Sequence, residues 1–199
     1  MIMKLCVFQG TFNPIHKAHI KMAEYVAEHY NFDKIIFIPA YKPPHKDYDD
    51  KMSLHRYNMV KLAIKNNPAF DISDIEYKSE EKSYSYLTIK KLYEIYPVEG
   101  KIKFIIGSDA FERIESWYET DKLKEIVDFL VFIRENSFNK KKFNHLKAKG
   151  YNFEFVDMDF IDISSSKLKN LIKENKPTDD FITKEVDYYI RENGLYESQ

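Results

Sequence analysis

The sequence contains a single cysteine, Cys6, in 199 residues. One thiol excludes an internal disulfide and a metal site built from several cysteines. Cys6 lies within a short apolar run, where a thiol behaves as a small hydrophobic side chain, so we expect it to be buried.

The chain also has almost no net charge. Its 31 lysines and arginines oppose 32 aspartates and glutamates, which leaves a formal net charge of −1. No overall field therefore draws the protein toward nucleic acid or an anionic membrane, and we expect neither as a partner. Any site for an anion has to be local.

Long apolar runs are missing as well, so nothing in the sequence is expected to span a bilayer. The first residues lead directly into an apolar run, without the regions of a signal peptide, which favours a cytoplasmic location. No repeat or low-complexity segment marks a linker. The length and the hydrophobic content of 44% predict a single domain over residues 1–199 with a sizeable core.

Short apolar runs alternate with stretches of helical spacing. This alternation predicts an α/β fold, with a doubly wound, mainly parallel sheet covered by helices on both faces. The expected strands are Lys4–Phe8, Lys34–Pro39, Phe70–Ser73, Lys101–Ile106, Val127–Ile133 and Asn152–Val156. The expected helices begin near Lys17 and then cover Met52–Ile64, Ser83–Tyr96, two short pieces of Ala110–Ile126, Asn139–Gly150, Ser164–Lys173 and Thr183–Glu192. The C-terminal helices, from about residue 164 to 199, are expected to pack back on the sheet.

In such a sheet, ligands collect at the carboxyl ends of the strands, near the point where the strand order reverses. Five segments follow expected strands, namely Gly10–His19, Pro39–Lys46, Gly107–Asp109, Arg134 and Ile163–Lys169. We therefore expect these five segments to converge on one crevice.

The stretch Gln9–His19 is the most informative of them. Gly10 and an Asn-Pro pair force a turn after the first strand, and helical spacing begins near Lys17. A strand, a glycine turn and a helix direct backbone N–H groups at one point, which favours phosphate. His16 and His19 are spaced so that both rings can face the same bound group.

This stretch resembles the (H/T)xGH signature of the nucleotidyltransferase superfamily, in the GTFxPxHxxH form of bacterial nicotinate-nucleotide adenylyltransferases. Ala18 stands where that family usually has a glycine, and Gln9 replaces a common first glycine. The resemblance implies the Rossmann-like nucleotidyltransferase fold. It also implies that ATP is bound by Gly10, Thr11, Phe12, Asn13, His16 and His19.

Further elements of the same family follow in order. His45 and Lys46 close a PPHK element, which in the family lies at the mononucleotide site. Gly107 and Asp109 resemble its GxD turn at the nucleotide site, and Arg134 resembles its strand-end arginine near substrate phosphate. The resemblance implies that these residues face the substrates.

A serine-rich segment near the C-terminus resembles the family's ISSTxxR signature, whose hydroxyls, backbone amides and cation hold the ATP phosphates. The matching residues are Ile163, Ser164, Ser165, Ser166 and Lys169. A serine N-cap alone would explain one serine, but not the basic residue a turn later. The lysine stands where arginine is usual, and it offers a point charge without the bidentate fork.

Acceptor recognition is implied by two more elements. Ser83, Tyr84 and Ser85 resemble the family's SYT element, which helps to recognise the pyridine carboxylate through backbone groups. Trp117 and Tyr118 match a WxxxxxL element whose aromatic ring lies beside the nicotinate ring.

Together, these motifs imply transfer of the adenylyl group of ATP to nicotinate mononucleotide, giving nicotinate adenine dinucleotide and pyrophosphate in NAD biosynthesis. The expected catalytic residues are His16, His19, Lys46 and Lys169. Mg²⁺ is expected to arrive on the ATP phosphates, since no carboxylate cluster in the sequence resembles a dedicated metal cage.

Two alternatives stay open. Leu87, where the family commonly has an aspartate, and Lys169 favour a nucleotidyltransferase for another phosphorylated acceptor. The second alternative is a non-catalytic nucleotide sensor of the same fold, although the pair His16 and His19 argues against it. The sequence also leaves a homo-oligomer open.

Overall fold

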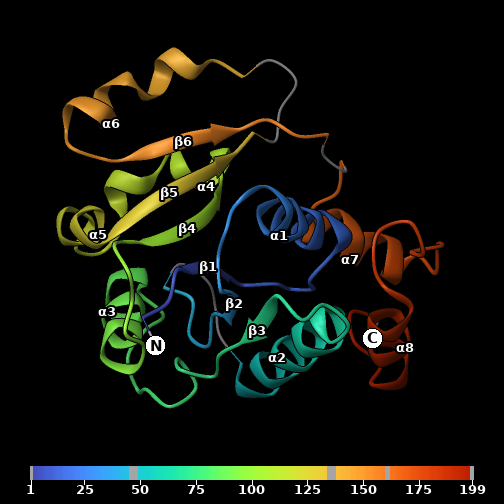
Figure 1. Ribbon diagram of the computed structural model, residues 1–199. Coiled ribbons are helices and arrows are strands. Elements are labelled where there is room, and N and C mark those ends of the chain that lie inside the picture. Colours follow the sequence, from blue (N-terminus) through green and yellow to red (C-terminus); the bar gives the residue numbers. More distant parts are fainter. Residues whose placement is uncertain (1, 45–48, 134–137, 160–161, 198–199) are drawn as a thin grey trace.

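The computed structural model describes residues 2–44, 49–133, 138–159 and 162–197. The sequence predictions at His45, Lys46 and Arg134 lie outside these ranges. Within them, six strands form one parallel sheet in the order β3-β2-β1-β4-β5-β6, with helices on both faces (Figure 1). The predicted α/β, doubly wound parallel fold is therefore confirmed.

The strands lie close to their predicted positions. They are β1 Leu5–Gly10, β2 Lys34–Pro39, β3 Phe70–Ile72, β4 Ile102–Gly107, β5 Val127–Phe132 and β6 Phe153–Val156. The helices are α1 Lys17–His29, α2 Asp50–Ile64, α3 Ser85–Ile95, α4 Ser108–Phe111, α5 Thr120–Ile126, α6 Asn144–Ala148, α7 Ser165–Lys173 and α8 Lys184–Glu192. Two 3₁₀ turns, η1 Ile114–Ser116 and η2 Lys140–Phe143, complete the elements. None of the helices in the described ranges is long and apolar enough to cross a membrane.

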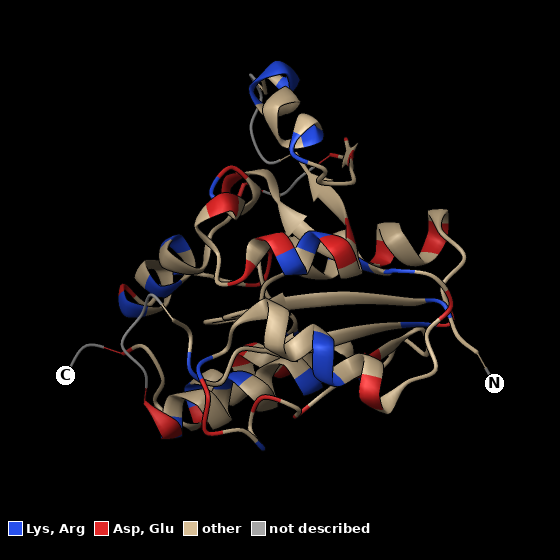
Figure 2. Cartoon of the chain, turned by 90° about the vertical axis from the view of Figure 1, so that its left-hand side faces the viewer, with Lys and Arg blue, Asp and Glu red and all other residues tan. Residues whose placement is uncertain are grey.

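The sheet is buried on both faces because successive strand residues point to opposite sides. Cys6 and Phe8 of β1 pack into one core with residues of α1, α2, α7 and α8. Leu5 and Val7 of the same strand pack into a second core with residues of α3, α4 and α5. Cys6 is fully buried, as the sequence predicts. Figure 2 shows basic and acidic residues interspersed along the helices outside these cores.

The strand order reverses between β1 and β4. The chain builds β2 and β3 on one side of β1 and then crosses over to place β4 on its other side. The loops that leave β1 and β4 therefore diverge, and a crevice opens between them at the carboxyl ends of these strands. The fold thus opens a crevice at the edge of the sheet where the sequence analysis expects the segments after the strands to meet.

The lysine-rich segment Asn139–Gly150 is expected from the sequence to form one exposed helix, and the structure differs. It forms the turn η2 and the short helix α6 instead, with Phe143 and Leu146 buried. The ring of Phe143 stacks on that of Phe111, with centroids 5.8 Å apart. This aromatic packing, rather than helical spacing of polar residues, fixes the segment.

The end of α8 gives a first prediction about stability. Gly194 has a φ of 57°, and the Leu195 N–H donates to the Ile190 carbonyl at 2.9 Å, which closes the helix. Replacing Gly194 with alanine is expected to reduce the free energy of unfolding by about 1 kcal/mol, since a side chain disfavours this conformation. Urea unfolding measures the loss. Gly194→Asn should lose less, and an alanine variant as stable as the natural protein would contradict the argument.

Candidate active site

A cavity of about 560 Å³ opens at the carboxyl ends of β1 and β4. Its walls come from the turn after β1, the loop after β2, the start of α3, the end of β4 and the segment after α4. The lining residues are Phe8, Gln9, Gly10, Thr11, Phe12, His19, Met22, Ala40, Pro43, Pro44, Ser83, Tyr84, Ser85, Phe104, Ile105, Ile106, Gly107, Asp109, Ala110, Ser116, Trp117 and Tyr118. The volume and the mixture of apolar and polar groups suit a small-molecule ligand.

The turn after β1 is held by aromatic packing. Phe12 has a φ of 46°, and its buried ring meets the ring of Phe8 edge-on at 5.3 Å. A Cβ on Gly10 would lie 3.1 Å from the Phe12 ring, so a side chain here would force the ring to shift by a few tenths of an ångström. The Asn13–Pro14 peptide bond in the same turn is cis. The backbone of the turn therefore runs directly beneath a phenylalanine ring that lines the cavity.

The two histidines at the start of α1 lie against each other. Their rings stack with centroids 3.7 Å apart and planes 23° apart. The Nδ1 atom of His19 accepts the backbone N–H of His16 at 3.3 Å. Because Nδ1 accepts, a neutral His19 carries its proton on Nε2, which can act as a donor. His19 lines the cavity, while the His16 ring behind it is 2% exposed.

The N-terminus of α7 is attached to the same turn. Ser165 Oγ donates to the Pro14 carbonyl at 3.1 Å, and Ser164 caps α7 by accepting the Lys167 N–H at 3.1 Å. Ile163 is buried, Ser166 is exposed and Lys169 is half-buried. Residues 163–169 do not line the cavity, and the bond to Pro14 connects them to it.

The residues expected to recognise the acceptor form one wall of the cavity. The rings of Tyr84 and Tyr118 stack with centroids 4.4 Å apart, and Trp117 packs edge-on against Phe104 at 6.2 Å. Ser83 is paired with the backbone of Lys42 by two hydrogen bonds of 2.9 Å. The structure therefore brings the start of α3 and the segment after η1 together across the cavity.

Two other sequence-predicted positions lie at the end of β4 and just after it. Gly107 ends the strand, and Asp109 lies in the first turn of α4; both line the cavity. Leu87, by contrast, lines a separate hollow of about 10 Å³ behind the wall. Its side chain is therefore not part of the large cavity.

The sequence analysis missed the buried cation Arg56, which is 3% exposed. Its guanidinium donates to the Thr11 carbonyl at 2.8 Å, to Ser53 Oγ at 2.9 Å and to the Tyr41 carbonyl at 3.3 Å. Burial lowers its pKa. Arg56 thus joins the turn after β1 to the loop after β2. Its position on the buried face of α2, one helical turn before Val60, is the signal that could have revealed it.

Two more residues were missed. Glu76, shortly after β3, is 5% exposed and hydrogen-bonds to the start of α3. The hydroxyl of Tyr196, beyond α8, donates to Asn13 Oδ1 in the turn after β1. Burial raises the pKa of both groups. Glu76 could have been found as a carboxylate just beyond a predicted strand. The sequence pattern gives no comparable signal for Tyr196.

No group of three or more His, Cys, Asp or Glu side chains that could hold a metal ion occurs among the described residues. The polar groups of the cavity are hydroxyls, backbone amides, the Gln9 side chain, the Trp117 indole, an imidazole and the carboxylate of Asp109. Such a set suits hydrogen bonding to phosphate and ribose groups more than direct coordination of a cation.

Comparison with known proteins adds independent findings. The cytidylyltransferase-like family model matches residues 7–190. A probable nicotinate-nucleotide adenylyltransferase of Clostridium botulinum is 41% identical over 196 residues, which cover 96% of this chain and 97% of the relative. A probable nicotinate-nucleotide adenylyltransferase of Caldicellulosiruptor saccharolyticus is 37% identical over 198 residues, which cover 98% of this chain and 99% of the relative. The solved nicotinic acid mononucleotide adenylyltransferase of Plasmodium falciparum, complexed with NaAD, has a TM-score of 0.80 at 22% identity, covering 97% of both chains.

Proposed function

Because the chain belongs to the cytidylyltransferase-like family, and within it resembles nicotinate-nucleotide adenylyltransferases over nearly its whole length, we infer that it transfers the adenylyl group of ATP to nicotinate mononucleotide. The products are nicotinate adenine dinucleotide and pyrophosphate, in the biosynthesis of NAD. The similarity to curated relatives along the full chain carries this conclusion, and the cavity at the strand ends supports it.

The reaction requires no nucleophile from the protein. An oxygen of the acceptor's phosphate forms a bond to the α-phosphorus of ATP, and the bond from this phosphorus to the bridging oxygen of pyrophosphate breaks. The protein has to hold two polyanions in line and offset the charge that develops on the leaving group. The turn Gly10–Asn13 provides backbone N–H groups for this task, and the start of α1 provides the imidazole of His19.

We assign the donor role at the transferring phosphate to His19, whose Nε2 carries the proton while Nδ1 accepts from the His16 backbone. His16 supports that ring by stacking on it. Lys169 offsets charge on the ATP phosphates, together with the hydroxyls and amides of Ser164–Ser166. Lys46 and Arg134 are assigned to the acceptor phosphate and the leaving group on the family resemblance.

The acceptor occupies the wall formed by the start of α3 and the segment after η1. Its pyridine ring lies beside Trp117 and the stacked rings of Tyr84 and Tyr118, which offer flat apolar faces. Backbone groups of Ser83–Ser85 hold the pyridine carboxylate. Mg²⁺ bound to the ATP phosphates would neutralise part of their charge. Among the described residues, Asp109 lines the cavity with a carboxylate.

The test is release of pyrophosphate from ATP in the presence of nicotinate mononucleotide, nicotinamide mononucleotide or a panel of other phosphomonoesters. We expect nicotinate mononucleotide to give the highest kcat/KM. Preference for a different phosphomonoester would replace the acceptor while keeping the reaction. Tight ATP binding without pyrophosphate release from any acceptor would instead make the protein a nucleotide sensor.

A further inference from the structure

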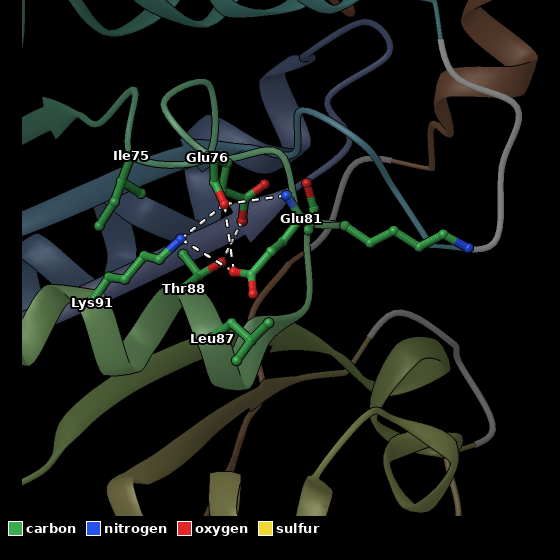
Figure 3. A pocket seen from close by; sticks show the side chains of 9 residues that line it. Ile75, Glu76, Glu81, Leu87, Thr88 and Lys91 are labelled. Atoms are coloured by element: carbon green, nitrogen blue, oxygen red, sulfur yellow. Dashed lines mark hydrogen bonds and ion pairs between the residues drawn. The ribbon is translucent and has the colours of Figure 1, made fainter.

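Glu76 is a buried carboxylate that the reaction itself does not use. It follows β3 and lies behind the acceptor wall, against Thr88 of α3 (Figure 3). Thr88 Oγ1 donates to its Oε1 at 2.7 Å, and the Tyr41 N–H donates to its Oε2 at 3.1 Å. The Gln9 amide also donates to it. Three donors from three separate segments therefore meet at one carboxyl group.

These donors belong to segments that form the cavity. Gln9 and Ser83 both line it, and Tyr41 belongs to the loop after β2 that also contributes Pro43. Ser83 is in turn paired through both its N–H and its hydroxyl with the Lys42 backbone. The carboxylate thus connects the end of β1, the loop after β2 and the start of α3 from behind.

Lys91, which lines the same small hollow as Glu76, is engaged elsewhere. Lys91 Nζ donates to Ser79 Oγ at 2.9 Å and to Glu81 at 3.3 Å (Figure 3). The hydrogen-bond partners given above for Glu76 are all neutral donors. Burial raises the pKa of Glu76, and these hydrogen bonds act against that shift.

One donor belongs to Gln9, which lines the cavity. Its amide nitrogen points at the carboxylate, which can only accept, while the buried Gln9 Oε1 has no hydrogen-bond partner among the described residues. The carboxylate therefore fixes the orientation of a side chain that lines the cavity.

We propose that Glu76 is a positioning residue that holds the acceptor wall, above all Ser83–Ser85 and Gln9, in the conformation that binds nicotinate mononucleotide. The proposal rests on the proposed function and adds to it a determinant of acceptor affinity. ATP binds mainly through the turn after β1 and the starts of α1 and α7, so its affinity does not depend on Glu76.

The test compares Glu76→Gln with the natural protein by steady-state kinetics in both substrates. An amide nitrogen in place of one oxygen would face a donor, so the variant should raise KM for nicotinate mononucleotide about tenfold, with KM for ATP within about twofold. Thr88→Val, which removes one donor and leaves the carboxylate, should shift the same KM by about threefold, and Thr88→Ser should restore it.

The matched control is Thr178→Val. Thr178 is 1% exposed, and its hydroxyl donates to Asp187 at 2.6 Å, remote from the acceptor wall. This control should lower the midpoint of thermal unfolding without separating the two KM values. If Glu76→Gln or Thr88→Val behaves in the same way, with both KM values unchanged or moving together, the positioning role is wrong.

Calorimetric titration with nicotinate mononucleotide separates this proposal from the proposed function. A natural protein that binds the mononucleotide but releases no pyrophosphate would overturn the function, and weaker binding by Glu76→Gln would still support positioning. A natural protein that does not bind it at all would overturn both.

Discussion

Replacing His19 with alanine is expected to lower kcat for pyrophosphate release by about a hundredfold, while the dissociation constant for ATP changes less than about threefold. His19 lies at the start of α1 and lines the cavity. Its Nδ1 accepts the His16 N–H at 3.3 Å, so its Nε2 carries the proton. In the proposed reaction, a donor in this place would stabilise charge that grows only as the bond to pyrophosphate breaks. Its loss should therefore affect turnover and not ground-state binding.

Steady-state kinetics beside calorimetric titration with ATP checks this expectation. His29→Ala is the matched control, because His29 ends the same helix, is exposed and hydrogen-bonds only locally to the Tyr25 carbonyl at 2.9 Å. It should keep the natural kcat. If His19→Ala loses turnover and ATP affinity to the same extent, His19 binds ATP and has no special role in the transition state.

The second large effect concerns stability. Arg56→Met should reduce the free energy of unfolding by about 3 kcal/mol, since it leaves the buried acceptors of Thr11, Tyr41 and Ser53 without their charged donor. The Met side chain matches the apolar volume but donates nothing. Urea unfolding followed by fluorescence of Trp117, the single tryptophan, measures the change.

Arg191→Met is the control for removal of an arginine. Arg191 forms an ion pair with Asp187 at 2.8 Å, and its side chain is 47% exposed. Solvent screens such a pair, so its loss should cost less than about 1 kcal/mol. Equal losses in the two variants would show that the contacts of Arg56 with the turn after β1 contribute little.

The parts of this fold that sequence reasoning predicts are those with local signals. β2 has the predicted bounds because its residues form an uninterrupted apolar run that Pro39 stops. The start of α1 at Lys17 follows from the turn chemistry before it and from the helical spacing after it. The position of the cavity follows in turn, because a doubly wound sheet opens at one known place.

What the sequence could not provide depends on contacts between distant segments. Gln9 stands out as a small departure from the family pattern, yet in the structure its amide is bonded to Glu76, which lies 67 residues away. Similarly, the Arg56 guanidinium donates to the Tyr41 carbonyl, and no local sequence pattern predicts that these two groups meet. Periodicity indicates which face of an element is buried, but not which atom a buried polar group will meet.

Three contacts to the turn after β1 come from the last quarter of the chain. Ser165 donates to Pro14, the Lys17 N–H donates to the Phe181 carbonyl at 2.7 Å, and Tyr196 donates to Asn13. During synthesis the N-terminal strands and helices emerge from the ribosome first. The turn nevertheless lacks these partners until residues 165–196 have been synthesised. A nascent chain therefore contains all six strands of the sheet, of which β6 ends at Val156, before the last partner of the turn exists.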